Sequence, residues 1–324
     1  MTKARLPRLL HLRSGCDGFI IVAVLWILAA LATLVTIFSM YVINTATAFT
    51  VHDERLQAEG FARAALELTV YQATAVPQAQ QGQQAQQAQQ AQPARGTFAF
   101  RLGNAVVNAE FVSETARIDL NVAPKELLSG LFVGLGASRG QADTYADRII
   151  GWRSPPPEDN SPSEAANYRT AGMLYGPRGA PFPHTGELAL VLGIPEVMVE
   201  RALPYLTVYS GQPQVNVFVA PPQVLAAVPG MDPGRLQAIL VQRAAAPQNE
   251  QTAQALLATL GAGQTHANTL GSKALRVTVR IAFNSGQRMT TEAVIFLLDS
   301  GNDPYRVLTW HDDMDSTSAN RGVR

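Results

Sequence analysis

Residues 19–43 read FIIVAVLWILAALATLVTIFSMYVI, a stretch of 25 residues without a charge, a proline or a glycine. At a rise of about 1.5 Å per residue, a helix of this length spans the hydrocarbon core of a bilayer, which is roughly 30 Å thick. The stretch therefore predicts one transmembrane helix, and the other segments of the chain are interpreted by their position relative to it.

The short segment before this helix predicts its orientation. Its charged residues are mostly basic: Lys3, Arg5, Arg8, Arg13 and Asp17. Cationic flanks stay in the cytoplasm, so the bulk of the chain is expected on the far side of the membrane. The alternative is a cleavable secretory signal, because residues 46–48 (Ala-Thr-Ala) look like a small-residue cleavage site and the mature protein would then begin near Phe49. A signal peptide has an apolar region of roughly 7–15 residues, which favours a retained helix here.

Composition fits a translocated protein of modest charge. The chain has 25 basic and 25 acidic residues, so no strong field would attract nucleic acid or acidic substrates. Its one cysteine, Cys16, precedes the helix. The histidines are scattered, and no zinc, nucleophile-elbow or phosphate-loop motif is present. We therefore expect a protein that is not an enzyme.

The apolar helix is expected to continue beyond the membrane. Over residues 44–76 apolar side chains recur at helical spacing opposite a polar face, and no glycine or proline separates this segment from the span. Residues 77–96 form a run rich in glutamine and alanine that has no apolar stripe, so this run predicts a linker.

Strand patterns occur in two blocks. Alternating segments at 97–102 and 106–112 flank Gly103-Asn104, and the same pattern returns at 275–283 and 289–298. Neither pair is stable alone, which favours one antiparallel sheet over two unrelated hairpins in separate domains.

The predicted fold class is accordingly α+β, with the N-terminal helix packed on the sheet and a large helical domain inserted between strands. Residues 97–113 and 272–311 would form the sheet domain and residues 114–271 the insertion. The polar tail at 312–324 is expected to be disordered.

The predicted insertion contains a near-repeat. IDLNVAPKELL at 118–128 is echoed by VNVFVAPPQVL at 215–225. Each predicts a short extended segment, a helix with proline near its start, a glycine turn and a second helix; a looser third unit follows residue 187. The glycines expected in these hairpin turns are Gly134, Gly136, Gly193 and Gly230.

Paired helices with a glycine turn are also typical of the helix-hairpin-helix, a motif that binds DNA by directing backbone N–H groups at a phosphate. A membrane-anchored protein that binds DNA outside the cytoplasm is therefore the alternative function. Against it, Asp232 stands in the second turn, and the zero net charge offers little release of counterions. We expect no nucleic-acid partner.

A basic leader that ends in Gly18, followed by Phe19 and an unbroken apolar helix, resembles the processing site of type IV pilins and type II secretion pseudopilins. The resemblance implies that prepilin peptidase removes residues 1–18 between Gly18 and Phe19 and that Phe19 becomes N-methylated. At the fifth position after the cut, where major pilins have a glutamate, this chain has Ala23. That absence, together with a large helical insertion in the sheet, resembles the K-type minor pseudopilin.

Further residues extend this resemblance into the predicted insertion: the IDLNVAP segment, Trp152-Arg153, Tyr168, Tyr175 and Glu187-Leu188. The resemblance implies a structural subunit at the tip of the pseudopilus, a filament used to export folded proteins across the outer membrane. The implied partners are two other minor pseudopilins in a heterotrimeric tip complex, prepilin peptidase and the inner-membrane secretion platform. The implied location is the bacterial inner membrane, with one span and most of the chain in the periplasm.

A proline-rich loop at 154–183 holds the densest set of oxygen ligands: Glu158, Asp159, Asn160 and Glu164. Calcium prefers hard oxygen ligands in flexible loops, and pseudopilins are known to have calcium-binding loops. A calcium site here is one interpretation, and a solvated loop without metal is the other. The family usually places aspartates on either side of the Trp-Arg pair, whereas this chain has Gly151 and Ser154.

Overall fold

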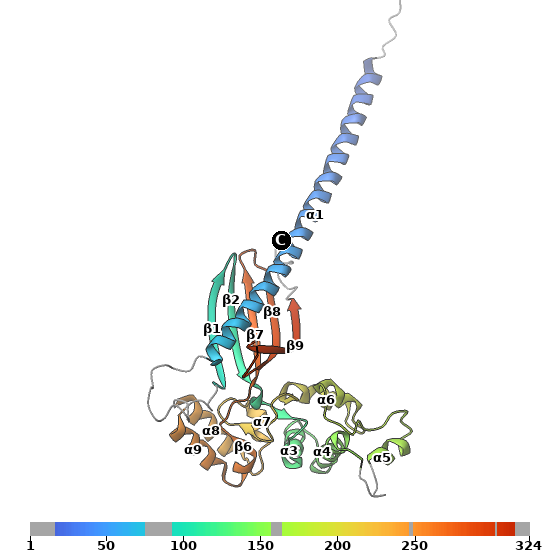
Figure 1. The fold of residues 1–324 in the computed structure, drawn as a ribbon. Coiled ribbons are helices and arrows are strands. Elements are labelled where there is room, and N and C mark those ends of the chain that lie inside the picture. Colours follow the sequence, from blue (N-terminus) through green and yellow to red (C-terminus); the bar gives the residue numbers. More distant parts are fainter. Residues whose placement is uncertain (1–16, 75–92, 157–163, 246–248, 302, 315–324) are drawn as a thin grey trace, which may run out of the picture. The chain divides into compact units, whose positions relative to one another are not determined.

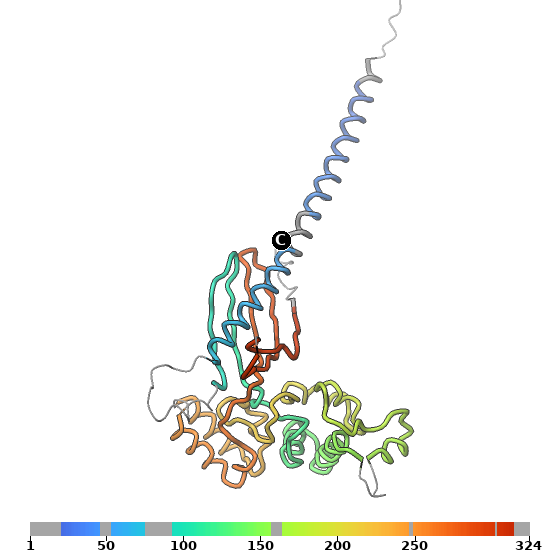
Figure 2. The backbone as a smooth tube through the Cα atoms, viewed as in Figure 1, coloured from blue at the N-terminus to red at the C-terminus, as the bar shows by residue number. Residues whose placement is uncertain are grey.

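The longest element of the fold is the helix α1 (Asp17–Thr74). The computed structural model describes residues 17–74, 93–156, 164–245, 249–301 and 303–314 (Figures 1 and 2). The chain divides into two compact units, residues 1–59 and residues 60–324.

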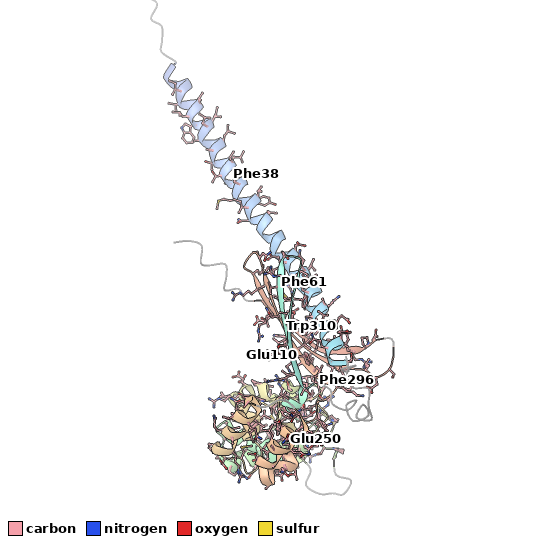
Figure 3. All side chains as sticks on the ribbon, turned by 90° about the vertical axis from the view of Figure 1, so that its left-hand side faces the viewer. Phe38, Phe61, Glu110, Glu250, Phe296 and Trp310 are labelled. Carbon is pink, nitrogen blue, oxygen red and sulfur yellow. The ribbon has the colours of Figure 1, made fainter. Side chains whose placement is uncertain are left out.

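In the first unit, the stretch Ile21–Thr45 has a mean hydropathy of 2.7 and is long and apolar enough to cross a membrane. Its large side chains point outward, as Phe38 does in Figure 3. The hydroxyl groups of Thr33 and Thr36 each donate to the carbonyl four residues earlier, at 2.8 Å. These bonds leave no unsatisfied hydroxyl donor at either position, as a lipid environment requires.

The second unit contains a five-stranded antiparallel sheet in the order β1-β2-β7-β8-β9. Its strands are β1 (Arg95–Leu102), β2 (Ala105–Ser113), β7 (Ala274–Phe283), β8 (Arg288–Leu297) and β9 (Tyr305–Met314). The neighbours β2 and β7 pair from Ala105↔Phe283 to Ser113↔Leu275. Residues 114–273, called the insertion below, therefore leave the sheet at the end of β2 and return at the adjacent strand. The chain is α+β, as the sequence predicts.

The strands extend slightly beyond their predicted limits. β1 begins at Arg95, within the segment expected to be a linker, and β9 ends at Met314, three residues beyond the expected end of the sheet. Asp312 belongs to the sheet because its carboxylate accepts a hydrogen bond of 2.7 Å from the hydroxyl of Thr291 on β8. Residues 75–92, most of the expected linker, and residues 315–324, most of the expected tail, lie outside the described part.

Residues 60–74 of α1 cover one face of the sheet (Figure 1). Ala62, Ala65 and Leu66 are almost completely buried. The rings of Phe61 and Phe283 lie 6.0 Å apart, and the hydroxyl of Tyr305 donates to Glu67 at 3.0 Å. This contact buries only part of the apolar face predicted for the continuing helix, because Leu68 and Tyr71 stay exposed.

The insertion contains short helices and two-residue strands. In chain order these are η1 (Glu114–Ala116), β3 (Ile118–Asp119), α3 (Lys125–Gly134), α4 (Arg139–Arg153), α5 (Glu164–Thr170), η2 (Thr185–Leu190), α6 (Glu196–Ala202), η3 (Leu203–Tyr205), β4 (Leu206–Thr207), β5 (Val215–Asn216), α7 (Pro222–Ala226), α8 (Pro233–Ala245), α9 (Glu250–Leu260), η4 (Gly261–His266) and β6 (Ala267–Asn268). The helices α3 and α7 pack closely, since a Cβ atom on Gly130 would lie 2.1 Å from the carbonyl oxygen of Ala227.

The near-repeat of sequence corresponds to repeated backbone hydrogen bonding. Each copy closes with a parallel pair of short strands, β3 with β4 and β5 with β6. In the first copy the N–H of Leu120 donates to the carbonyl of Thr207, and in the second the N–H of Val217 donates to that of Asn268. Each bond joins the start of a copy to its end.

In each copy, an arginine from the second helix donates hydrogen bonds to equivalent backbone carbonyls. Arg153, at the end of α4, donates to the carbonyls of Leu120 and Ala123. Arg243, in the last turn of α8, donates to the corresponding carbonyls of Val217 and Ala220. Burial lowers the pKa of both guanidinium groups, and the positive charge of Arg95 lowers that of Arg243 further. Each cation thus stabilises a turn whose carbonyls point into the protein.

The two copies differ at the second strand residue, which is Asp119 in one and Asn216 in the other. Both side chains accept a bond from the N–H two residues later. The other oxygen of Asp119 accepts bonds from Ser210 and Gly211, whereas the amide of Asn216 donates to the carbonyl of Leu270 at 2.9 Å. The acid occurs where the opposing loop offers hydrogen-bond donors, and the amide occurs where that loop offers a carbonyl acceptor.

A buried ionic network joins the insertion to the sheet. Glu114 has a completely buried side chain that accepts bonds from Arg276 on β7 (2.8 Å), Arg117 (3.3 Å) and the hydroxyl of Thr207. Burial alone would lower the pKa of Arg276, but the carboxylates of Glu114 and Glu292 together outweigh it and the pKa is raised. Arg276 also pairs with Glu292 on β8. The network therefore connects Glu114, Arg117 and Thr207 of the insertion to the strands β7 and β8.

Replacing Glu114 by glutamine should destabilise the protein by about 3–5 kcal/mol, because the buried guanidinium groups lose their anion. The control is Glu110→Gln, which removes an exposed carboxylate 3.7 Å from Arg280 and should cost less than about 1 kcal/mol. Denaturant unfolding of both variants checks the difference. Equal losses would contradict a central role for the network.

Replacing Asn216 by aspartate should destabilise the protein by about 3 kcal/mol or more at neutral pH, because a buried carboxylate would face the carbonyl of Leu270. Below about pH 4 a protonated acid can donate to that carbonyl, so part of the stability should return. The control is Asn108→Asp on the exposed face of β2. Melting temperatures measured across pH test this; a variant equally stable at pH 4 and 7 would refute it.

Candidate interaction sites

The residues of the expected processing site lie at the N-terminal end of α1, which begins at Asp17. The backbone of Gly18 and Phe19 is helical, and Ala23 lies at a partly exposed position further along. Residues 1–16 of the expected leader lie outside the described part. Cleavage and methylation at this site stay predictions.

Residues 60–74 of α1 also present a face that the sheet does not cover. On it Leu68 is 40% exposed and Tyr71 is 71% exposed, with Ala64 half-buried one turn before Leu68. Arg63 and Glu67 flank these residues and are exposed too. An apolar stripe with charged flanks on a helix is a suitable contact for a second helix.

Three of the four predicted turn glycines need glycine for their backbone conformation. Gly136, Gly193 and Gly230 have positive φ values of 103°, 83° and 77°. Gly134 is instead the last residue of α3 and has no positive φ, so the first turn depends on Gly136. The paired helices are shorter than expected, because α7 has five residues and η2 is a 3₁₀ helix. The helix-hairpin-helix interpretation stays a prediction.

The helices that follow the first two turns have caps within the chain itself. Ser138 accepts a bond from the N–H of Gln141 at the start of α4 and forms a capping box with it. At α8, a carboxylate oxygen of Asp232 accepts bonds from the N–H groups of Gly234 (2.9 Å) and Arg235 (3.0 Å). An anion therefore already occupies the place where a DNA phosphate would have to bind.

The expected calcium ligands divide between described and undescribed residues. Glu158, Asp159 and Asn160 lie outside the described part. Glu164 lies within it, and its carboxylate accepts bonds from Arg148 (2.8 Å) and Asn167 (2.9 Å). Over the described ranges, no group of three or more His, Cys, Asp or Glu side chains is placed to hold a metal ion. Calcium binding stays a prediction.

The residues that suggested a family resemblance gather in one aromatic cluster. Trp152 lies between Tyr168 and Phe182, with ring centroids 5.9 and 6.2 Å away, and Tyr175 packs edge-on against Tyr168. Burial raises the pKa of Tyr168 to about 12. The cluster holds the chain segments before and after residues 157–163 together.

Glu187 anchors this cluster by two bonds. Its carboxylate accepts from the indole N–H of Trp152 at 3.3 Å and from Arg178 at 2.7 Å. The sequence singles out Trp152 and Glu187 separately but does not predict this contact. The two residues are 35 positions apart, and nothing between them signals that they lie close together.

Comparisons with known proteins agree with this architecture. Residues 104–211, from β2 through β4, match the family model of Type II secretion system (T2SS), protein K. No curated protein matches the chain. Among solved structures, the fold is similar to a chain of the GspK-GspI-GspJ complex from the enterotoxigenic Escherichia coli Type 2 Secretion System. The TM-score is 0.52 at 16% identity, over 81% of this chain and 98% of that chain.

The family match lies within the second unit and includes β3, α3, α4 and the aromatic cluster described above. The similar fold in a solved structure covers most of both chains. The resemblance inferred from the sequence is thus confirmed, and residues 104–211 carry the match to the type II secretion system protein K family.

Proposed function

We propose that this chain is a minor pseudopilin that caps the tip of the type II secretion pseudopilus. It is a structural subunit for the export of folded proteins across the outer membrane. The observation that carries the proposal is the match of residues 104–211 to the protein K family, in a chain with a large insertion between two adjacent strands of a sheet that residues 60–74 of α1 cover. Ala23, in place of the glutamate that pilins use to contact the preceding subunit, supports a terminal position.

The size of the insertion gives a physical reason for this position. Pilin-like subunits stack along a filament, so each head must leave room for the next subunit. The insertion spans residues 114–273 and is fixed to the sheet by the Glu114 network. A head of that width, held rigidly, would clash with a copy placed above it, whereas the last subunit has no such neighbour.

The proposed location is the bacterial inner membrane, with the N-terminus in the cytoplasm and the second unit in the periplasm. The basic residues before α1 support this orientation. Prepilin peptidase would cut between Gly18 and Phe19, and Phe19 would be N-methylated. The secretion platform of the inner membrane would then take up the mature subunit.

The proposed partners are two companion minor pseudopilins in a heterotrimeric tip complex. The solved structure with a similar fold is a complex of three different chains, GspK, GspI and GspJ. On the present chain, the uncovered stripe around Leu68 and Tyr71 is the surface offered to a partner helix.

The alternative, an extracytoplasmic DNA-binding protein, has weaker support. Asp232 caps α8, and the zero net charge offers little counterion release. A tip subunit should show no shift of duplex DNA in a gel at moderate salt. DNA binding under these conditions would favour the alternative.

Replacing Leu68 and Tyr71 by aspartate should weaken the complex with the two companion pseudopilins of the same secretion system by at least tenfold. Both side chains are exposed, so the fold should be kept while an apolar contact is lost. The control is Val241→Asp, which changes a residue that is 57% exposed on α8. Sedimentation of the three purified chains in detergent measures assembly. Failure of the unmodified chain to assemble would contradict the proposal.

Replacing Gly18 by valine should block removal of the leader, because the proposed peptidase needs a small residue before the cut. The control is Gly15→Val, which makes the same change three residues earlier in the leader. Mass spectrometry of the membrane-extracted proteins should find methylated Phe19 at the N-terminus in the wild type and the control only. A wild-type N-terminus near Phe49 would instead indicate a cleaved secretory signal.

A further inference from the structure

The strand β1 is an edge of the sheet, and its pairing with β2 shows which backbone groups face outward. The N–H of Ser113 donates to the carbonyl of Ala94, and the N–H of Asn284 donates to that of Asn104. Antiparallel strands alternate inward and outward groups, so these two bonds fix the pattern along β1 and β2. Arg95, Thr97, Ala99 and Arg101 therefore direct their N–H and C=O groups away from β2.

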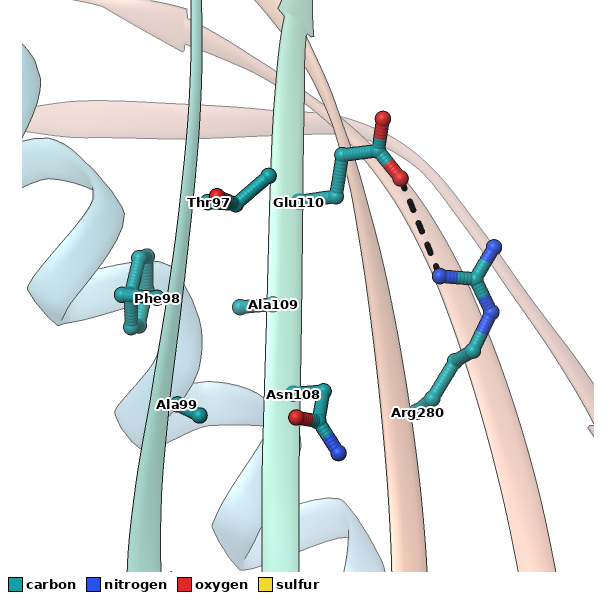
Figure 4. A pocket seen from close by; sticks show the side chains of 7 residues that line it. All are labelled: Thr97, Phe98, Ala99, Asn108, Ala109, Glu110 and Arg280. Carbon is teal, nitrogen blue, oxygen red and sulfur yellow. Dashed lines mark ion pairs between the residues drawn. The ribbon is translucent and has the colours of Figure 1, made fainter.

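The same four residues have exposed side chains, on the sheet face opposite α1. Beside them lies a hollow of about 320 Å³ (Figure 4). Its lining residues are Thr97, Phe98, Ala99, Asn108, Ala109, Glu110 and Arg280. The small side chains of Thr97 and Ala99 leave the middle of the edge open.

Charge is arranged unevenly along this edge. Arg95 and Arg101 stand at its two ends, and neither forms an ion pair with another residue of the described part. Arg280 pairs with Glu110 at only 3.7 Å, and both side chains are about half exposed. One cation and one anion thus line the hollow, and Arg95 and Arg101 add two positive charges at the ends of the strand.

The two edges of the sheet differ in how open they are. β9, the other edge, has a register shift opposite Val294 and Ile295, a device that discourages further pairing. β1 pairs with β2 over eight residues without such a shift. On the side facing α1, the half-buried rings of Phe98 and Phe100 stack 6.3 Å apart and offer an apolar surface.

We propose that β1 binds an extended acidic segment of a companion minor pseudopilin, which adds a sixth strand to the sheet. Backbone groups of Thr97, Ala99 and Arg101 would pair with it. Because side chains of a strand alternate, its acidic residues would lie toward Arg95 and Arg101, and its apolar residues toward Phe98 and Phe100. This inference rests on the proposed function, since it names a contact within the tip complex.

Amide hydrogen exchange of the full chain in detergent, alone and mixed with the two companion pseudopilins, tests the inference directly. In the complex, the amides of Thr97, Ala99 and Arg101 should exchange at least tenfold more slowly, while those of Phe98 and Phe100 are already protected by β2. A complex that forms without slowing these three amides would overturn the strand addition and leave the proposed function standing. Absence of any complex would contradict both.

Two variants test the contact by affinity. Ala99→Pro removes an outward N–H from an edge position where proline is tolerated, and Arg101→Glu reverses a charge of the edge. Each should weaken assembly about tenfold, whereas the control Arg306→Glu, an exposed arginine of β9, should not. Circular dichroism of all three should match the wild type. Equal effects of Arg101→Glu and Arg306→Glu would refute a specific role for β1.

Discussion

The buried contact between Glu114 and Arg276 is the constraint on which the arrangement of the second unit depends. Glu114 begins the insertion, and Arg276 lies just after its end on β7. A carboxylate without exposure to water needs compensating charges and hydrogen-bond donors. Here two arginines supply the positive charge, and the hydroxyl of Thr207 supplies a further donor. Nearby, Ser113 and Ser272 bond across the same junction. The insertion can therefore be large without separating β2 from β7.

Within the insertion, two copies of one turn are stabilised in the same way and differ at one polar side chain. Each turn leaves carbonyls pointing inward, and an arginine from a helix further along the chain satisfies them. Both arginines are partly buried where they reach those carbonyls, and this burial lowers the pKa of each. Asp119 and Asn216 then adapt each copy to its own closing loop. The second copy thereby keeps the first copy's scaffold with shorter helices.

Much of the fold could be predicted because its signals are local. The apolar run predicts the long N-terminal helix, and alternating apolar residues around a glycine turn predict the hairpins. Gly103 and Gly286 in these turns both have positive φ values. The short extended segments at β3 and β5 were expected, but their parallel pairing with β4 and β6 could not be found, because the partner strands are too short for a periodic pattern and are distant in sequence. The roles of Arg153 and Arg243 were missed for the same reason.

The candidate sites show the same division. Gly136 and Gly230 follow from the need for a left-handed backbone, whereas Gly134 looked equivalent and is an ordinary helical residue. The contact of the Glu164 carboxylate with Arg148, a residue on another helix, gave no signal in the sequence, whereas the oxygen-rich neighbours of Glu164 did. The contact between Trp152 and Glu187 likewise needed three-dimensional information.

The account depends on this chain being the last subunit of a filament, and counting copies in assembled pseudopili tests that most directly. Single-molecule photobleaching of a fluorescently labelled chain, in purified filaments of defined length, gives the number and position of copies. We expect one bleaching step at one end of each filament, whatever its length. Several copies spaced along the filament, in numbers that rise with length, would contradict the account.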